Sequence, residues 1–129
     1  MDKAAVTDKP VEWSEDQPIY RQLMDRLLER IIDRTYGEGD LLPSVRQLAT
    51  DYGVNPLTAA KAYQELAKYK VTEKRRGIGF VVKSGVRDAL LKRERNRFIE
   101  EEWPQIQERM ERLGIDPKDL LQETAKEKK

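Results

Sequence analysis

Apolar side chains recur every three or four residues after Pro18, which predicts an amphipathic helix of about four turns. Asp16 or Gln17 would precede this helix, Pro18 would start it, and Tyr36 and Gly37 would end it. The apolar stripe consists of Ile19, Tyr20, Leu23, Met24, Leu27, Leu28, Ile31 and Ile32. We expect this stripe to face the core of the domain. It is wide enough for its edge to contact something other than the core.

Residues 44–68 predict two short helices joined by a tight turn, a helix-turn-helix. Gly53 supplies the positive φ that ends the first helix, Asn55 is placed to cap the second, and Pro56 takes its first position. The second helix has an apolar face made of Ala59, Ala62, Tyr63 and Leu66. Its opposite face carries Leu57, Lys61, Gln64 and Lys68, with Thr58 on the flank. Such a face suits a DNA groove, although similar helix pairs occur in many all-helical proteins.

Two short segments after these helices, residues 71–76 and 80–83, have the composition of β-strands, and Gly77-Ile78-Gly79 between them predicts a hairpin turn. A very short strand is also predicted at residues 41–42. A helix-turn-helix followed by a hairpin is a winged helix. The cations that flank its tip are Lys74, Arg75 and Arg76. Glycine at the tip lets backbone approach a phosphate or a minor groove; the alternative is a solvated hairpin whose cations serve solubility.

The chain outside residues 17–83 divides into three further segments. Residues 1–16 predict a flexible arm, in which Trp13 is expected to dock on its own domain. Residues 84–122 predict helices, and the terminal residues 123–129 should fray. The fold class expected is therefore mostly α, an α+β winged helix followed by a helical tail.

Pro104 interrupts the helical pattern of the tail and predicts either a kink or a break near Glu102. Gly114 is expected to close that helix, with Asp116 capping a last helix that starts at Pro117.

The apolar faces of the tail predict a dimer. A domain of roughly 65 residues does not need two more amphipathic helices for its own core, so these faces need a partner. The simplest partner is the same helix pair of a second subunit; the alternative is a tail packed back on its own winged helix. The candidate dimerisation residues are Leu90, Phe98, Ile99, Trp103, Ile106, Met110 and Leu113.

Composition excludes several classes of function. The 129 residues include no Cys and no His, which rules out disulfides, thiol chemistry and nearly all zinc sites, and we expect no cofactor. No pair of carboxylates lies in an evident apolar pocket, so an enzyme is not expected. Apolar runs fall short of the ~18 residues that span a bilayer, and the N-terminus lacks the apolar core of a signal peptide. The sequence therefore predicts a cytoplasmic protein without a membrane partner.

The net charge of +1 hides an uneven distribution of charge. Residues 1–43 carry 6 basic and 10 acidic side chains, residues 44–83 carry 8 and 3, and residues 84–129 carry 11 of each. The positive charge thus lies on the helix-turn-helix and the hairpin. A basic patch on an otherwise balanced protein is typical of a DNA-binding protein.

Four blocks of sequence resemble the winged-helix domain of the GntR family of bacterial transcription factors. They are PIYRQL at 18–23, GDLLPSVRQLA at 39–49, GVNPLTAAKAYQEL at 53–66 and RRGIGFVV at 75–82. The second and third blocks and the short tail resemble the YtrA subfamily in particular. This resemblance implies a regulator without a large effector domain, typically a repressor of nearby transporter operons, and it identifies no small-molecule effector.

The resemblance also implies which residues contact DNA. Arg46 takes the place of a DNA-contacting arginine, and Gly77 that of the glycine at the wing tip. Pro56 and Ala60 stand where many members have arginines, so Lys61 and Gln64 are expected to substitute for them. Lys70 replaces a common glycine, which costs on the order of 1 kcal/mol if its φ is positive. The predicted DNA-binding set is Ser44, Arg46, Asn55, Leu57, Thr58, Lys61, Gln64, Lys74, Arg75, Arg76 and Gly77.

The sequence therefore predicts a dimeric regulator that binds palindromic double-stranded DNA. The alternative is a winged helix that serves as a protein-protein adaptor.

Overall fold

The computed structural model describes residues 12–127, so most of the predicted N-terminal arm and the last two residues of the predicted frayed tail lie outside the described residues. The chain divides into two compact units, Met1–Leu90 and Leu91–Lys129. Across residues 12–127, no helix combines the length and the apolar character needed to cross a membrane.

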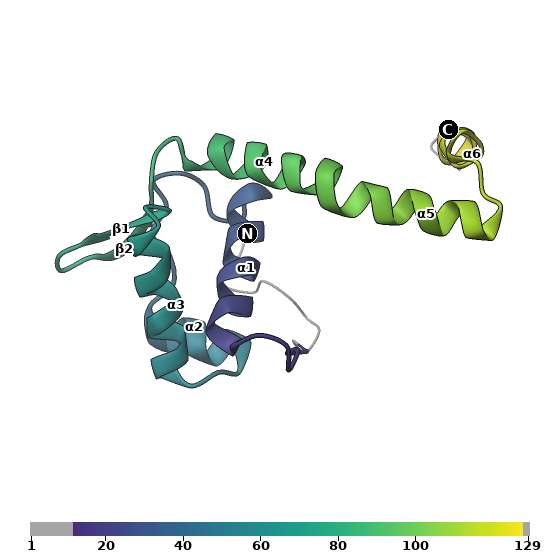
Figure 1. Ribbon diagram of the computed structural model, residues 1–129. Helices are drawn as coiled ribbons and strands as arrows, with labels where there is room; N and C mark the ends of the chain where they lie inside the picture. The colour runs from purple at the N-terminus through teal and green to yellow at the C-terminus, as the bar shows by residue number, and fades with distance from the viewer. Residues whose placement is uncertain (1–11, 128–129) are drawn as a thin grey trace. The chain divides into compact units, whose positions relative to one another are not determined.

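The first unit is a winged helix (Figure 1). Its elements are α1 (Ile19–Ile32), α2 (Val45–Tyr52), α3 (Pro56–Lys68), β1 (Thr72–Arg75) and β2 (Gly79–Val82). The two strands are antiparallel, in a register that runs from Thr72 opposite Val82 to Arg75 opposite Gly79. The predicted short strand appears as an isolated bridge between Leu41 and Val81. The predicted fold class is confirmed.

Local capping interactions determine where α2 and α3 begin and end. The Ser44 Oγ accepts a hydrogen bond from the backbone N–H of Gln47 at 3.1 Å, and Gly53 ends α2 with a φ of 64°. The Asn55 Oδ1 accepts one from the backbone N–H of Leu57 at 2.8 Å, with proline at the first position of α3. The predictions for Gly53, Asn55 and Pro56 are confirmed, and the Ser44 cap is an additional finding.

The core is formed where one face of each helix meets the others. Its most deeply buried members are Leu23, Leu27, Ile31, Leu48, Ala59, Ala62, Tyr63 and Leu66. The prediction for the end of α1 was wrong, because the helix ends at Ile32 and Arg34 reverses the chain with a φ of 68°. That reversal places Tyr36 in the core with 2% of its surface exposed. Burial raises the pKa of Tyr36 to about 12, so its hydroxyl stays neutral.

The described end of the N-terminal arm is attached to α1. Trp13 packs partly buried against the core, and the Arg26 guanidinium lies 5.6 Å from the centre of its ring. The Gln22 side-chain amide accepts a hydrogen bond from the backbone N–H of Ser14 at 2.8 Å and donates one to the backbone carbonyl of Ser14 at 2.7 Å. Trp13 therefore docks on its own domain, as predicted.

Helix α4 (Val86–Arg97) begins inside the first unit. The backbone N–H of Arg87 donates to a Glu38 carboxylate oxygen at 3.1 Å, and this bond lowers the pKa of Glu38. The Arg87 Nε donates to the Ile32 carbonyl at 2.8 Å. Leu90 is only 8% exposed and belongs to the core of the winged helix. Leu90, a predicted dimerisation residue, is thus largely covered by its own chain.

The second unit contains the rest of α4, a π-helical segment (η1, Phe98–Glu102), α5 (Trp103–Leu113) and α6 (Pro117–Glu127). Gly114 closes α5 with a φ of 69°, as predicted. The Asp116 Oδ1 caps α6 by accepting from the backbone N–H of Lys118 at 2.9 Å, and this helix continues past residue 122 to Glu127.

The tail passes Pro104 without a break. Arg97 and Glu102 both have helical backbone angles, and the Trp103 N–H donates to the Phe98 carbonyl five residues back. A proline has no N–H and its ring crowds the carbonyl four residues earlier, so a wider π-helical turn accommodates it. The expected break is therefore absent, and the hydrogen-bonding pattern changes locally at residues 98–102.

Met110, another predicted dimerisation residue, is only 8% exposed within the chain itself. It therefore offers little surface to a second subunit.

Lys70 lies in the left-handed region with a φ of 64°, where a side chain is strained. We expect Lys70→Gly to raise the free energy of unfolding by about 1 kcal/mol, because glycine adopts this φ without a steric cost. Urea denaturation measures the change. Gln64→Gly, at an exposed position in the interior of α3, is the matched control and should lower the same free energy by about 1 kcal/mol. A less stable Lys70→Gly protein would contradict the strain argument.

Candidate nucleic-acid interface

The outward face of α3 carries the residues predicted to meet DNA. Leu57, Lys61, Gln64 and Lys68 are exposed and Thr58 is half-buried, while the other face of α3 is buried in the core. Leu57 is 79% exposed, the largest exposure among the large apolar side chains of the described residues. The predicted division of this helix into two faces is confirmed.

The start of α2 contributes a serine and an arginine. Ser44 uses its oxygen as a cap, which leaves its hydroxyl proton free to donate; Asn55 likewise keeps its amide N–H groups. The Arg46 side chain is exposed, and its guanidinium makes no hydrogen bond or ion pair within residues 12–127. Its donors are therefore available to an anion.

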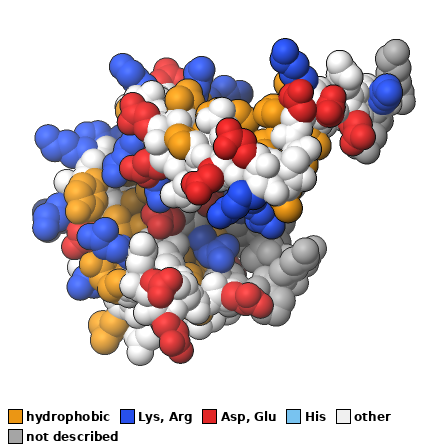
Figure 2. Space-filling view, turned by 45° about the vertical axis from the view of Figure 1, so that its right-hand side comes forward, with side chains coloured by type: hydrophobic (Ala, Val, Ile, Leu, Met, Phe, Trp, Pro, Cys, Tyr) orange, Lys and Arg blue, Asp and Glu red, His pale blue; other side chains and the backbone are white. Residues whose placement is uncertain are grey.

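The hairpin forms the wing and carries three consecutive exposed cations. Figure 2 shows Lys and Arg side chains gathered at the edge of the molecule where the hairpin lies in Figure 1. Arg75 lies 3.9 Å from the Glu73 carboxylate, but both side chains are more than half exposed, so this pair is weak. Gly77 has a φ of 77°, and nothing within 4 Å would meet an added Cβ atom there. The wing tip is thus open to a partner.

An aromatic contact fixes the wing against α3. The rings of Tyr63 and Phe80 lie 5.0 Å apart at 44°. The Tyr63 hydroxyl donates to the Pro43 carbonyl at 2.6 Å, and burial raises its pKa. Leu42 donates its backbone N–H to the Phe80 carbonyl at 2.9 Å. Helix α3, the start of α2 and the wing therefore hold defined positions relative to one another.

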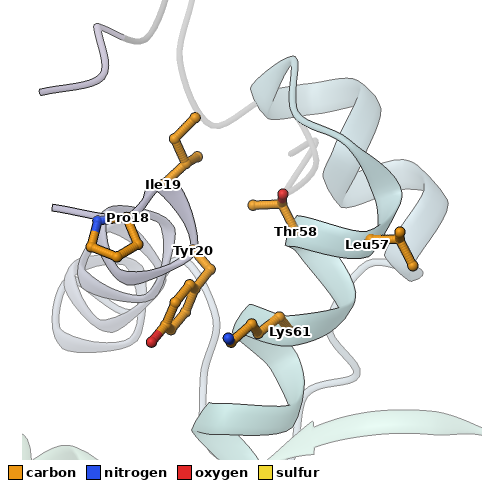
Figure 3. A pocket seen from close by; sticks show the side chains of 6 residues that line it. All are labelled: Pro18, Ile19, Tyr20, Leu57, Thr58 and Lys61. Carbon is orange, nitrogen blue, oxygen red and sulfur yellow. The ribbon is translucent and has the colours of Figure 1, made fainter. Parts of the chain in front are cut away.

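Two hollows flank the outward face of α3. The α1 hollow, of about 400 Å³, is lined by Pro18, Ile19, Tyr20, Leu57, Thr58 and Lys61 (Figure 3). The wing hollow, of about 280 Å³, is lined by Val45, Ala60, Gln64, Ala67, Lys74 and Phe80. The structure thus brings three predicted DNA-binding residues together in the first hollow and two in the second.

Sequence analysis missed Tyr20, which it assigned to the core stripe of α1. The Lys61 ammonium lies 4.4 Å from the centre of the Tyr20 ring. The only signal in the sequence was the width of the apolar stripe on α1, which left the edge of that stripe without an assigned contact.

This surface is suited to binding a polyanion. It combines cations from α2, α3 and the wing with hydroxyl, amide and apolar groups, the mixture used to grip phosphates and contact base edges. In the part of the chain that the structure describes, no group of three or more acidic side chains is placed to hold a metal ion.

Comparison with known proteins places this geometry in a family. The model described as bacterial regulatory proteins, gntR family, matches residues 19–82. The HTH-type transcriptional repressor YtrA of Bacillus subtilis (strain 168) is 34% identical over 99 residues, which cover 77% of this chain and 70% of that protein. The uncharacterized HTH-type transcriptional regulator YhcF of the same bacterium is 29% identical over 113 residues, covering 86% and 90% of the two chains.

A solved structure agrees with these relatives. A GntR family transcriptional regulator from Listeria monocytogenes is similar with a TM-score of 0.63 and 29% identity, covering 88% of this chain and 98% of that chain. The family comprises transcription regulators, which confirms the prediction that the chain is not an enzyme. The family match over the winged helix and the identity to YtrA show that this chain belongs to the GntR family of transcriptional regulators and carries its DNA-binding domain.

Proposed function

We propose that this regulator is a homodimeric repressor that binds a palindromic operator through α3, the start of α2 and the wing. The observation that carries the proposal is the outward face of α3, flanked by exposed cations on elements that core contacts hold in place. Because bacterial DNA lies in the cytoplasm, the proposal also places the protein there.

The repressor role is supported by the relative YtrA, whose name describes a transcriptional repressor. Its extension to the chain's own operon and to neighbouring transporter genes follows the resemblance to the YtrA subfamily. A reporter gene behind the chain's own upstream DNA tests this role. Expression of the protein should lower the reporter signal, and an unchanged or higher signal would argue against repression.

The dimer is supported by exposed apolar side chains in the second unit. They are Phe98, Ile99, Ile106, Leu113, Leu120 and Leu121, each at least 40% exposed. Trp103, which is half-buried, lies within the same segment. Apolar groups at this density favour a self-complementary interface, and a two-fold dimer presents two copies of α3 to half-sites about one DNA turn apart.

Selection from a pool of random DNA duplexes tests the proposal and separates it from the protein-protein adaptor. We expect an enriched sequence with two inverted half-sites roughly 10 base pairs apart. A pool from which nothing is enriched, at low salt as well, would instead favour the adaptor.

Arg75→Ala is expected to weaken binding to every duplex and to lower the slope of log affinity against log salt by about one, because one fewer counterion is released. Fluorescence anisotropy over a salt series measures both. Glu73→Gln is the matched control, since it removes the carboxylate beside Arg75 and should strengthen binding. If Arg75→Ala leaves affinity and slope unchanged, the wing lies outside the interface.

Gln64→Ala is expected to change which base is preferred, because Gln64 faces outward near the middle of α3. A lost base contact costs about 1 to 3 kcal/mol on the selected duplex and little on scrambled DNA. Competition between single-base variants of the selected duplex measures this preference. Gln122→Ala, an exposed glutamine on α6, should leave it unchanged. Equal losses on both DNAs would show that Gln64 contacts only the backbone.

Phe98→Ala and Trp103→Ala are each expected to weaken the dimer by about 2 kcal/mol or more, as buried aromatic anchors of interfaces usually do. Sedimentation over a concentration series measures the dissociation constant. Leu57→Ala truncates a more exposed apolar side chain on α3 and should leave the dissociation constant unchanged. A wild type that sediments as a monomer at high concentration contradicts the dimer.

A further inference from the structure

The Lys61 side chain does not point straight out of α3. It reaches across the α1 hollow toward α1, and its ammonium lies 4.4 Å from the centre of the Tyr20 ring (Figure 3). Leu57, one turn earlier, points away from α1 in the same view. A lysine ammonium within about 6 Å of a tyrosine ring is attracted to its face. Lys61 and Leu57 therefore point to different sides of α3, Lys61 toward α1 and Leu57 away from it.

The Tyr20 ring is a fixed platform for this cation. Tyr20 lies in the first turn of α1, is half-buried and packs against the core cluster. The flexible stem of Lys61 would otherwise sample many rotamers in water. Contact with a fixed ring restricts these rotamers before a partner arrives, so less conformational entropy is lost on binding.

Among the residues that the structure describes, none is an acidic partner for the charge of Lys61. Within residues 12–127 it makes no ion pair and no hydrogen bond, and no Asp or Glu lines the α1 hollow. The hollow instead offers the Thr58 hydroxyl and apolar walls from Pro18 and Ile19. A cation, a hydroxyl and apolar walls match one sugar-phosphate unit of a DNA strand: the phosphate for the cation, the deoxyribose for the walls.

We infer that Tyr20 is a positioning residue, which holds the Lys61 ammonium at the α1 edge of α3 so that it binds a DNA phosphate and not a base edge. This inference rests on the proposed DNA binding and refines it. Base contacts then fall to the outward Gln64 and to Leu57, whose side chain can meet a thymine methyl group.

A double-mutant cycle tests the inference with wild type, Tyr20→Leu, Lys61→Met and the double variant. Each protein is titrated with the duplex selected from the random pool and with a scrambled duplex, over a range of KCl concentrations. Lys61→Met should weaken binding to both duplexes by the same factor and lower the log-log salt slope by about one.

Tyr20→Leu should weaken binding to both duplexes about two- to five-fold, the effect of an exposed cation-π contact, and leave the salt slope unchanged, because the lysine is still present. In the Lys61→Met background Tyr20→Leu should have no further effect. A general loss of structure would lower affinity in both backgrounds, so the cycle separates positioning from damage.

Tyr20→Phe is the matched control, since it keeps the ring and removes the hydroxyl; it should bind like wild type. A loss in Tyr20→Phe equal to that in Tyr20→Leu would assign the effect to the hydroxyl and overturn the inference. So would a Lys61→Met loss confined to the selected duplex. The Lys61→Met outcome decides the matter even if thermal melting shows that Tyr20→Leu is unfolded.

The same titrations distinguish failure of this inference from failure of the proposed function. A wild type that binds neither duplex overturns both. A wild type that binds, together with additive effects of Tyr20→Leu and Lys61→Met, overturns the positioning role alone.

Discussion

Burial of one face of α3 is the constraint on which the rest of the first unit depends. Ala59 and Ala62 are fully buried, and their small side chains let α1 and α2 pack close to α3. The neighbouring Tyr63 fills the space beside them and donates its hydroxyl to the Pro43 carbonyl. Because the helical repeat places the remaining side chains on the opposite side, burial of this face leaves the opposite face of α3 exposed to solvent. The surface offered to DNA is thus determined by the core behind it.

The position of the wing also depends on the buried face of α3, because side chains of the wing pack against side chains of that helix. Phe80 stacks on Tyr63, and the Lys74 ammonium lies 5.8 Å from the centre of the Phe80 ring. The cations of the hairpin therefore have a defined position relative to α3, although they are exposed. This arrangement explains how a chain with a net charge of only +1 still presents a basic surface: the excess positive charge is concentrated on elements that share one core.

Much of the fold was predictable from local sequence signals, whereas contacts between residues distant in sequence were not. The caps at Gly53, Asn55 and Gly114 act within a few residues of sequence, so their side chains or positive φ values indicate where helices begin and end. Leu90 and Tyr20 could not be assigned in this way. Periodicity shows that a side chain lies on an apolar face, but the partner of that face is chosen in three dimensions. Leu90 therefore joined the core, and Tyr20 met a lysine of α3.

Pro104 illustrates how a residue that opposes helix formation can shape a surface. In a regular α-helix, Phe98 and Trp103 are five positions apart and would point roughly 140° away from each other. The Trp103 N–H instead donates to the Phe98 carbonyl, so one wider turn of the π-helical segment separates them and reduces the angle between their positions around the helix. The missing N–H of Pro104 favours this wider turn. The proline thus changes the angular spacing between the two largest apolar side chains of the tail without ending the helix.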